Sequence, residues 1–243
     1  MSFFRQLAEA ILNVALPPRC HICHEPVSDA RILHICNDCL AGLPVLAAPF
    51  CSICGTPYTG VGSNHPCSSC ITSPPPYQAA RAALRYEGCC RKLIHTFKYQ
   101  RRSQLRRPLG LLTARLLAGF VEEQQPDLLL PVPLHHTRLR KRGFNQAVLL
   151  AELLAEQWRI PLQRQGLVRT RPTTPQMELS RPERFKNLKG AFSVPHSTAL
   201  TGRHVMLVDD VVTTGSTLAA CAEVLLQAGC ARVSAVTIAH AIL

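Results

Sequence analysis

Residues 205–217, VMLVDDVVTTGST, constrain the fold more than any other stretch of the chain. Four apolar residues at 205–208 predict a short strand buried on both faces, as the strands of a parallel sheet are. Two carboxylates, Asp209 and Asp210, follow it. A turn rich in hydroxyl groups then leads into a helical pattern. This order of strand, turn and helix predicts an α/β fold.

The same stretch carries the chemistry of a site for a ribose 5′-phosphate. A glycine allows close approach of the backbone to a phosphate, hydroxyl groups donate hydrogen bonds, and a helix start is electropositive. The two carboxylates can accept from vicinal ribose hydroxyls, directly or through Mg²⁺. The alternative is an ordinary corner in which the polar side chains only cap the helix. The turn consists of Thr213, Thr214, Gly215, Ser216 and Thr217.

Eight of the twelve cysteines form two repeats with the identical spacing C-x2-C-x12-C-x2-C. Sets of four thiolates with no open position predict structural Zn²⁺, about two ions per chain. Disulfides or redox motifs are weaker interpretations, because nothing indicates secretion and redox motifs do not come in matched pairs of pairs. The sequence leaves open which pairs share an ion, and nearby histidines are alternative ligands. The ligand set is Cys20, Cys23, Cys36 and Cys39 in the first repeat and Cys51, Cys54, Cys67 and Cys70 in the second.

The chain is strongly basic, with 27 Lys and Arg against 15 Asp and Glu and a formal net charge of +12. Such an excess favours polyanionic partners, namely phosphorylated sugars, pyrophosphate or nucleic acid, although a basic surface can also serve solubility alone. Residues 1–16 read as an amphipathic helix whose apolar residues are too interrupted for a signal peptide. Since no apolar run has the length of a membrane span, we expect a cytoplasmic protein.

The segment TSPPP at residues 72–76 is the expected boundary between the cysteine modules and the rest. It divides the chain into an N-terminal helix at 1–19, a double zinc module at 20–71 and a larger domain at 77–243. Strands are expected at residues 80–86, 127–132, 163–169, 191–194, 205–208 and 232–238, and helices at 90–99, 105–121, 145–158 and 218–228. The alternation predicts a mostly parallel sheet covered by helices on both faces, with ligands bound at the carboxyl ends of its strands.

Two basic segments are candidate anion sites. The first is expected to be a loop after the strand at 127–132, placed for a diphosphate unless it is merely flexible and exposed. It contains Arg138, Arg140, Lys141, Arg142 and Gly143. The second surrounds Phe97 and Tyr99 and suits a nucleic-acid backbone with stacked bases, although a solvated helix face is the commoner explanation. It comprises Lys92, Lys98, Arg101, Arg102, Arg106 and Arg107.

Taken together, these motifs resemble those of the ComF family, which includes GntX-like proteins. The resemblance lies in the paired cysteine knuckles and in LRYEGCCRKLIHTFKYQ, PVPLHHTRLRKRGFNQA, TPQMELSRPERFKNLKGAF and VMLVDDVVTTGSTL. It implies a type I phosphoribosyltransferase fold. Asp209 and Asp210 would be the catalytic acids that meet the ribose hydroxyls, and residues 213–217 would hold the 5′-phosphate. A flexible cover over the site would contain Gln176, Arg181, Arg184 and Asn187.

The resemblance also implies a function. The chain is similar to proteins that bind phosphoribosyl diphosphate (PRPP) with Mg²⁺ and are linked to DNA uptake or to the use of DNA as a nutrient. The activities to expect are phosphoribosyl transfer or PRPP cleavage. One alternative is a non-enzymatic adaptor that binds single-stranded DNA or a helicase partner during DNA uptake. Another is a nucleotide sensor that keeps the pocket for control alone.

Overall fold

A four-stranded parallel sheet organises the computed structural model, which describes residues 18–27, 33–100, 102–172, 188, 190–195 and 200–242. The strands lie in the order β1-β6-β5-β2, with β1 at Ala79–Arg85, β6 at Arg232–His240, β5 at His204–Val212 and β2 at Leu128–Pro131. A separate antiparallel pair joins β3, Val168–Arg169, to β4, Phe192–Ser193. The expected parallel sheet is therefore confirmed.

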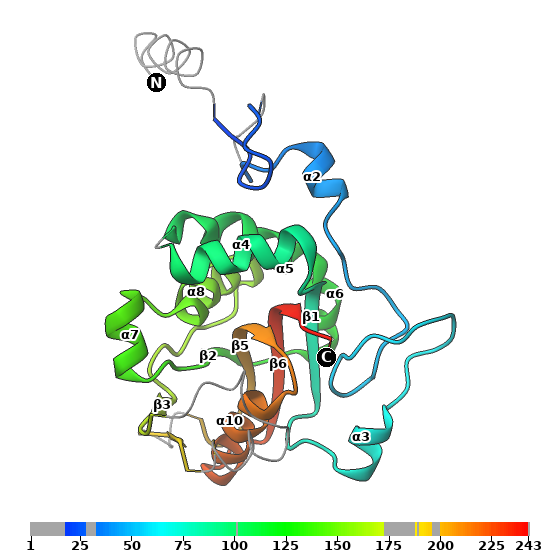
Figure 1. The fold of residues 1–243 in the computed structure, drawn as a ribbon. Helices are drawn as coiled ribbons and strands as arrows, with labels where there is room; N and C mark the ends of the chain where they lie inside the picture. The colour runs from blue at the N-terminus through cyan, green and yellow to red at the C-terminus, as the bar shows by residue number, and fades with distance from the viewer. Residues whose placement is uncertain are drawn as a thin grey trace.

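Helices cover both faces of the sheet, because successive strand residues point to opposite sides and both sides of β5 are apolar. Figure 1 shows α4, α5 and α8 on one side of the sheet and α10 on the other. Met206 and Val208 belong to the core cluster on the side of α4, α5 and α8, whereas Val205 and Leu207 belong to the cluster on the side of α10. These helices span Gly88–Tyr99, Arg106–Leu116, Gln146–Trp158 and Ser216–Gln227 respectively. The side chain of Asn145 caps α8 by accepting from the N–H of Ala147 at 3.0 Å, as an N-cap residue does.

Several elements differ from the expectation. The single helix expected at 105–121 is a 3-10 turn at Ser103–Leu105 followed by α5 and α6, Ala118–Gln124, with a break at Leu117. The basic loop is the short helix α7, His136–Arg142, in which His135 caps the first turn and three cations complement the carboxyl-terminal dipole. Only β3 forms a strand within residues 163–169. Two further short helices, α2 at Asn37–Ala41 and α3 at Ser68–Thr72, belong to the cysteine repeats.

Strand β5 is longer than predicted and includes the two acids. Its pairing with β6 continues from Asp209 opposite Thr237 to Val212 opposite His240, so the backbone stays extended past the apolar run. On its other side, β2 pairs only as far as Pro131 opposite Val208. The acids therefore lie at the carboxyl edge of the sheet, beyond the end of β2, which is where ligands bind in folds of this kind.

The second cysteine repeat packs against the outer edge of β1. The Ala80 N–H donates to the carbonyl of Ile53 in this repeat at 2.7 Å, and the N–H of Leu46, in the segment before the repeat, donates to the carbonyl of Ala83 at 3.0 Å. These bonds satisfy backbone groups that an edge strand would otherwise expose. The second repeat is thus bonded to the sheet through main-chain contacts.

Part of the expectation falls outside the described residues. The predicted N-terminal helix lies almost wholly within residues 1–17, and the four residues of the predicted cover, Gln176, Arg181, Arg184 and Asn187, lie within 173–187. In the portion of the chain that the structure does describe, we find no helix both long and apolar enough to cross a bilayer.

Candidate functional site

Each cysteine repeat gathers its own four sulfur atoms. The Sγ atoms of Cys20, Cys23, Cys36 and Cys39 lie within 4.8 Å of one another, and so do those of Cys51, Cys54, Cys67 and Cys70. This grouping answers the pairing question that the sequence left open, and no histidine belongs to either group. Four sulfur donors at this spacing fit tetrahedral Zn²⁺ in a closed, structural site.

Backbone donors prepare both tetrads for metal. The N–H groups of Ile22 and Cys36 donate to the Cys20 sulfur at 3.4 Å each, and those of Cys54 and Cys67 donate to the Cys51 sulfur at 3.4 and 3.2 Å. Burial raises the pKa of the Cys20 and Cys51 thiols, but these hydrogen bonds outweigh it and bring each pKa to about 6. The thiolate, which is the form that binds zinc, is therefore favoured at neutral pH.

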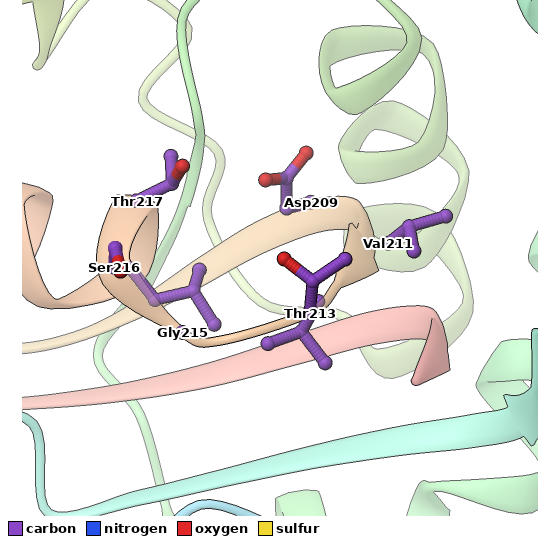
Figure 2. A pocket seen from close by; sticks show the side chains of 8 residues that line it. Asp209, Val211, Thr213, Gly215, Ser216 and Thr217 are labelled. Atoms are coloured by element: carbon purple, nitrogen blue, oxygen red, sulfur yellow. The ribbon is translucent and has the colours of Figure 1, made fainter. Parts of the chain in front are cut away.

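A pocket opens at the carboxyl end of β5, with about 240 Å³ of empty volume that includes some open solvent. Figure 2 shows Asp209, Thr213 and Thr217 around this hollow, at the end of the strand and along the turn that leads into α10. The lining is Asp209, Val211, Val212, Thr213, Gly215, Ser216, Thr217 and Leu218. The structure thus brings the predicted phosphate turn and the first acid together.

Gly215 gives the turn its shape. It has φ +74°, in the left-handed region that favours glycine, and a Cβ there would lie 2.8 Å from the hydroxyl oxygen of Tyr77. The helix α10 starts at the next residue, and the Thr214 and Ser216 hydroxyls are hydrogen-bonded at 2.8 Å. Since the first N–H groups of a helix have no partner within it, the turn and the helix start together suit an oxyanion.

The two acids point to different faces of the sheet. Asp209 lines the pocket on the α10 side, whereas Asp210 forms an ion pair with Lys98 of α4 at 2.8 Å between Oδ1 and Nζ. Neighbouring residues on a strand alternate in this way, so the two carboxylates do not face one ligand side by side. The expectation for Lys98, a place on a solvated helix face, is wrong: 16% of its side chain is exposed.

The ionisation of Asp209 is shifted. Burial and the adjacent charge of Asp210 raise its pKa to about 7, although the Asp210 N–H and the cations Lys98 and Arg169 act in the opposite direction. The Asp210 N–H donates to Asp209 Oδ1 at 2.8 Å. Asp209 therefore changes charge near neutral pH, as groups at binding and catalytic sites often do.

The cations of the predicted basic loop lie in different environments. Arg138 is half-buried and close enough to Arg169 and His135 to lower the pKa of each, after burial. Arg142 instead donates to Gln146 at 3.0 Å and to the Tyr99 hydroxyl at 3.2 Å. Arg140, Lys141 and Gly143 are exposed. Among the cations of this predicted loop, Arg138 acts by its charge on Arg169, and Arg169 in turn acts by its charge on Asp209.

Sequence reasoning missed Lys98 and Arg169, whose charges act on Asp209, and His135, whose pKa is lowered by Arg169 after burial. Lys98 looked like one charge of a surface run, and Arg169 ended a weakly patterned segment. His135 is 3% exposed, and its Nε2 atom has no hydrogen-bond partner. Because Nδ1 accepts from the Thr137 N–H at 3.4 Å, the ring proton lies on Nε2, which can therefore donate to an anion. The structure places His135 at the N-cap of α7, a helix that the sequence did not predict.

Comparison with known proteins identifies both parts of the chain. Residues 11–71 match the double zinc ribbon domain, and residues 144–242 match the phosphoribosyl transferase domain. The DNA utilization protein YhgH of Escherichia coli (strain K12) is 39% identical over 166 residues, which is 66% of this chain and 71% of that protein. The chain belongs to the ComF family. It therefore carries a double zinc ribbon followed by a phosphoribosyltransferase-like domain.

Other members of the family carry competence names. Competence protein F of Haemophilus influenzae is 38% identical over 141 residues, covering 56% of this chain and 62% of that protein. Competence protein ComFC of Bacillus subtilis is 37% identical over 112 residues, covering 46% and 43%. The word competence belongs to the names of these relatives.

Solved structures are similar at a low level. A phosphoribosylpyrophosphate synthetase from Mycobacterium smegmatis aligns with a TM-score of 0.33 and 19% identity over 52% of this chain and 33% of that chain. A purine phosphoribosyltransferase from Pyrococcus horikoshii aligns with a TM-score of 0.35 and 17% identity, over 58% and 82%. The fold assignment of this ComF-family chain rests on the domain match and on its parallel sheet.

Proposed function

We propose that this ComF-family protein binds PRPP or a related ribose phosphate at the carboxyl end of β5. The pocket that joins Asp209 to the turn at 213–217 carries this proposal. The turn and the start of α10 would hold the 5′-phosphate through N–H and hydroxyl donors. Asp209 would accept hydrogen bonds from the ribose hydroxyls. Arg169, Arg138 and His135 would attract the diphosphate, and Mg²⁺ would accompany it.

Calorimetry with PRPP and Mg²⁺ tests the binding claim. Asp209→Asn should weaken the binding of PRPP by at least about tenfold, because hydrogen bonds to a charged acceptor contribute about 1.5–3 kcal/mol. Glu156→Gln is the matched control, because it removes an exposed carboxylate on α8. The affinity of this variant for PRPP should equal that of the wild type. Absence of PRPP binding in the wild type, or equal affinity in Asp209→Asn, contradicts the proposal.

Catalysis is a separate part of the proposal. The groups around the pocket would stabilise a departing pyrophosphate by charge, as Arg and Mg²⁺ do in phosphoryl and ribosyl chemistry. We infer that the protein cleaves PRPP or transfers its ribosyl group to an acceptor. Release of pyrophosphate from PRPP by the zinc-loaded protein, with and without nucleobases, distinguishes an enzyme from a sensor that only binds.

A second function, binding of single-stranded DNA as an adaptor, is favoured by one observation. The Tyr99 ring is 58% exposed, and the Arg142 guanidinium lies 4.9 Å above its centroid. An aromatic face beside cations provides a stacking surface for bases and contacts for phosphates. The relatives named for DNA utilization and competence agree with such a role.

Fluorescence anisotropy with a labelled oligonucleotide tests this second function. The affinity should fall steeply with salt and fall at least about fivefold in Tyr99→Ala, since stacking contributes about 1–3 kcal/mol per base. It should be unchanged in Asp209→Asn, because the pocket lies on the α10 side of the sheet. Affinity that does not depend on salt, or that is insensitive to Tyr99→Ala, argues against this role.

A further inference from the structure

The second cysteine tetrad is hydrogen-bonded to the end of the strand that flanks the pocket. The Cys54 sulfur lies 3.1 Å from the Thr56 hydroxyl oxygen, and that oxygen lies 3.3 Å from Nε2 of His240. His240 is 3% exposed and is the last residue of β6. Among the residues that the structure describes, its Nδ1 atom has no hydrogen-bond partner. The contact with Thr56 is therefore the one that orients the imidazole ring.

The direction of this chain of hydrogen bonds depends on the state of Cys54. A sulfur that binds zinc carries no proton and can only accept, so the Thr56 hydroxyl must donate to it. The hydroxyl oxygen then accepts from the Nε2–H group of His240. A protonated thiol is only a weak acceptor, so the chain has no fixed direction without the metal.

His240 adjoins the lining of the pocket. It pairs with Val212 across β6 and β5, and the next residue along, Ala241, donates its N–H to the Val212 carbonyl at 2.8 Å. Val212 and its neighbour Val211 both line the pocket. The end of β5 that carries the pocket is therefore held by residues at the end of β6, where the second tetrad is attached.

Two close packing contacts bring the same module against the pocket's surroundings. A Cβ on Gly55, beside Cys54, would lie 2.6 Å from the Ala80 carbonyl oxygen, so this loop of the repeat packs directly on β1. The chain that leaves the repeat leads to Tyr77, which is 3% exposed. Its hydroxyl oxygen would lie 2.8 Å from a Cβ on Gly215, so Tyr77 packs against the turn that lines the pocket.

We propose that the second tetrad is a positioning element of the pocket, which holds the carboxyl ends of β5 and β6 through Thr56 and His240 when zinc is bound. Loss of this zinc then loosens the strand ends and weakens binding in the pocket, although the sheet stays folded. Hydrogen bonds to metal ligands commonly connect a metal site to its surroundings in this way. The inference rests on the proposed function only for the identity of the ligand.

Hydrogen exchange followed by mass spectrometry on zinc-loaded protein tests the connection without any ligand. Thr56→Val keeps the shape of the side chain but lacks the hydroxyl, so exchange at residues 236–241 should be at least about threefold faster, as expected for one lost hydrogen bond. Thr56→Ser keeps the hydroxyl and should exchange as the wild type does. Thr59→Val makes the same change at an exposed position of the same repeat and should have no effect. Exchange in β2 is the internal reference and should be equal in all these proteins.

Substitution of one ligand in each tetrad tests the role of the metal. Cys70→Ser should accelerate exchange at residues 236–241 and lower the affinity for PRPP, measured by calorimetry with Mg²⁺, by at least about threefold, the effect expected when one hydrogen bond is lost. Cys39→Ser, in the first tetrad, should change neither quantity, because it is the second tetrad that is bonded to His240.

Three results overturn the proposal. The first is equal exchange at residues 236–241 in Thr56→Val and Thr56→Ser, a comparison that decides even if Cys70→Ser does not fold. The second is an equal acceleration in β2, which shows that Thr56 has a purely structural role. The third is faster exchange with unchanged PRPP affinity. A wild type that binds no PRPP contradicts the proposed function instead, and the exchange results still decide whether the tetrad holds the strand ends.

Discussion

At the scale of single residues, Asp209 and Asp210 show how strand geometry separates two chemically identical neighbours. Alternation directs Asp210 toward α4 and Lys98, and it leaves Asp209 in the pocket beside the turn. Their environments therefore differ although their sequence context does not. One acid is neutralised by a fixed cation, and the other titrates near pH 7.

The shifted pKa of Asp209 predicts a stability change that depends on pH. Its pKa is about 7 in the folded chain and 3.8 in its ordinary state, so the folded form binds the proton more tightly. The favourable contribution of the protonated acid is complete below about pH 4 and is lost as pH rises through 7. Asp209→Asn stays neutral and should therefore stabilise the protein relative to wild type, more at pH 8.5 than at pH 6.

Urea denaturation of both proteins at the two pH values measures this difference in the free energy of unfolding. Glu156→Gln again serves as the control, because it makes the same change from carboxylate to amide at an exposed position on α8. A difference between Asp209→Asn and wild type that is the same at both pH values contradicts the raised pKa.

At the scale of elements, the contact between the second zinc repeat and β1 depends on one arginine. The Arg81 guanidinium donates to the carbonyls of Cys51, Ser52 and Ala80 at 3.3, 3.1 and 2.8 Å. It also lies 4.5 Å from the ring centroid of Phe50 and 5.1 Å from that of Phe120 in α6. One side chain thus connects the metal module, the edge strand and a helix.

Arg81→Met should loosen this contact and destabilise the chain by about 2 kcal/mol, since it removes charged hydrogen bonds and cation–π contacts. Limited proteolysis should then cleave within residues 57–66 faster than in the wild type. Arg85→Met, four residues further along β1, is the control, and equal cleavage of the two variants would show that Arg81 does not hold the module.

At the scale of the whole molecule, the two tetrads are chemically alike but differently supported. In the first, Cys23 is exposed, whereas the second has Cys51 and Cys70 buried. The second is also connected to the sheet: the Cys54 sulfur lies 3.1 Å from the Thr56 hydroxyl, which lies 3.3 Å from His240 Nε2 at the end of β6. A hydrogen bond to a ligand sulfur holds that ligand in place around the metal.

We therefore expect a chelator to remove zinc in two phases of about one equivalent each. The fast phase should come from the first tetrad and disappear in Cys39→Ser. The slow phase should accelerate in Thr56→Val, because the connection from Cys54 to His240 is broken. Absorbance of a zinc-binding dye over time measures both phases, and a single phase of two equivalents would contradict the asymmetry.

The predicted division into residues 1–19, 20–71 and 77–243 stays a prediction. The main-chain bonds from Ile53 and Leu46 to β1 show why composition alone does not decide it. A linker such as residues 72–76 marks where the chain changes character. The contacts that fold back across it depend on which strand lies at the edge of the sheet.

The sequence by itself determined the features that depend on local chemistry and spacing: the two cysteine tetrads, the parallel sheet and the hydroxyl-rich turn around Gly215. Tertiary structure alone decided how the tetrads close, which acid enters the pocket, and that Lys98 is a partner of Asp210 rather than a surface charge. The physical reason is the distance along the chain over which each effect acts. Spacing and propensity act within a turn or a strand, whereas the environment of a charge is set by whatever the fold packs against it.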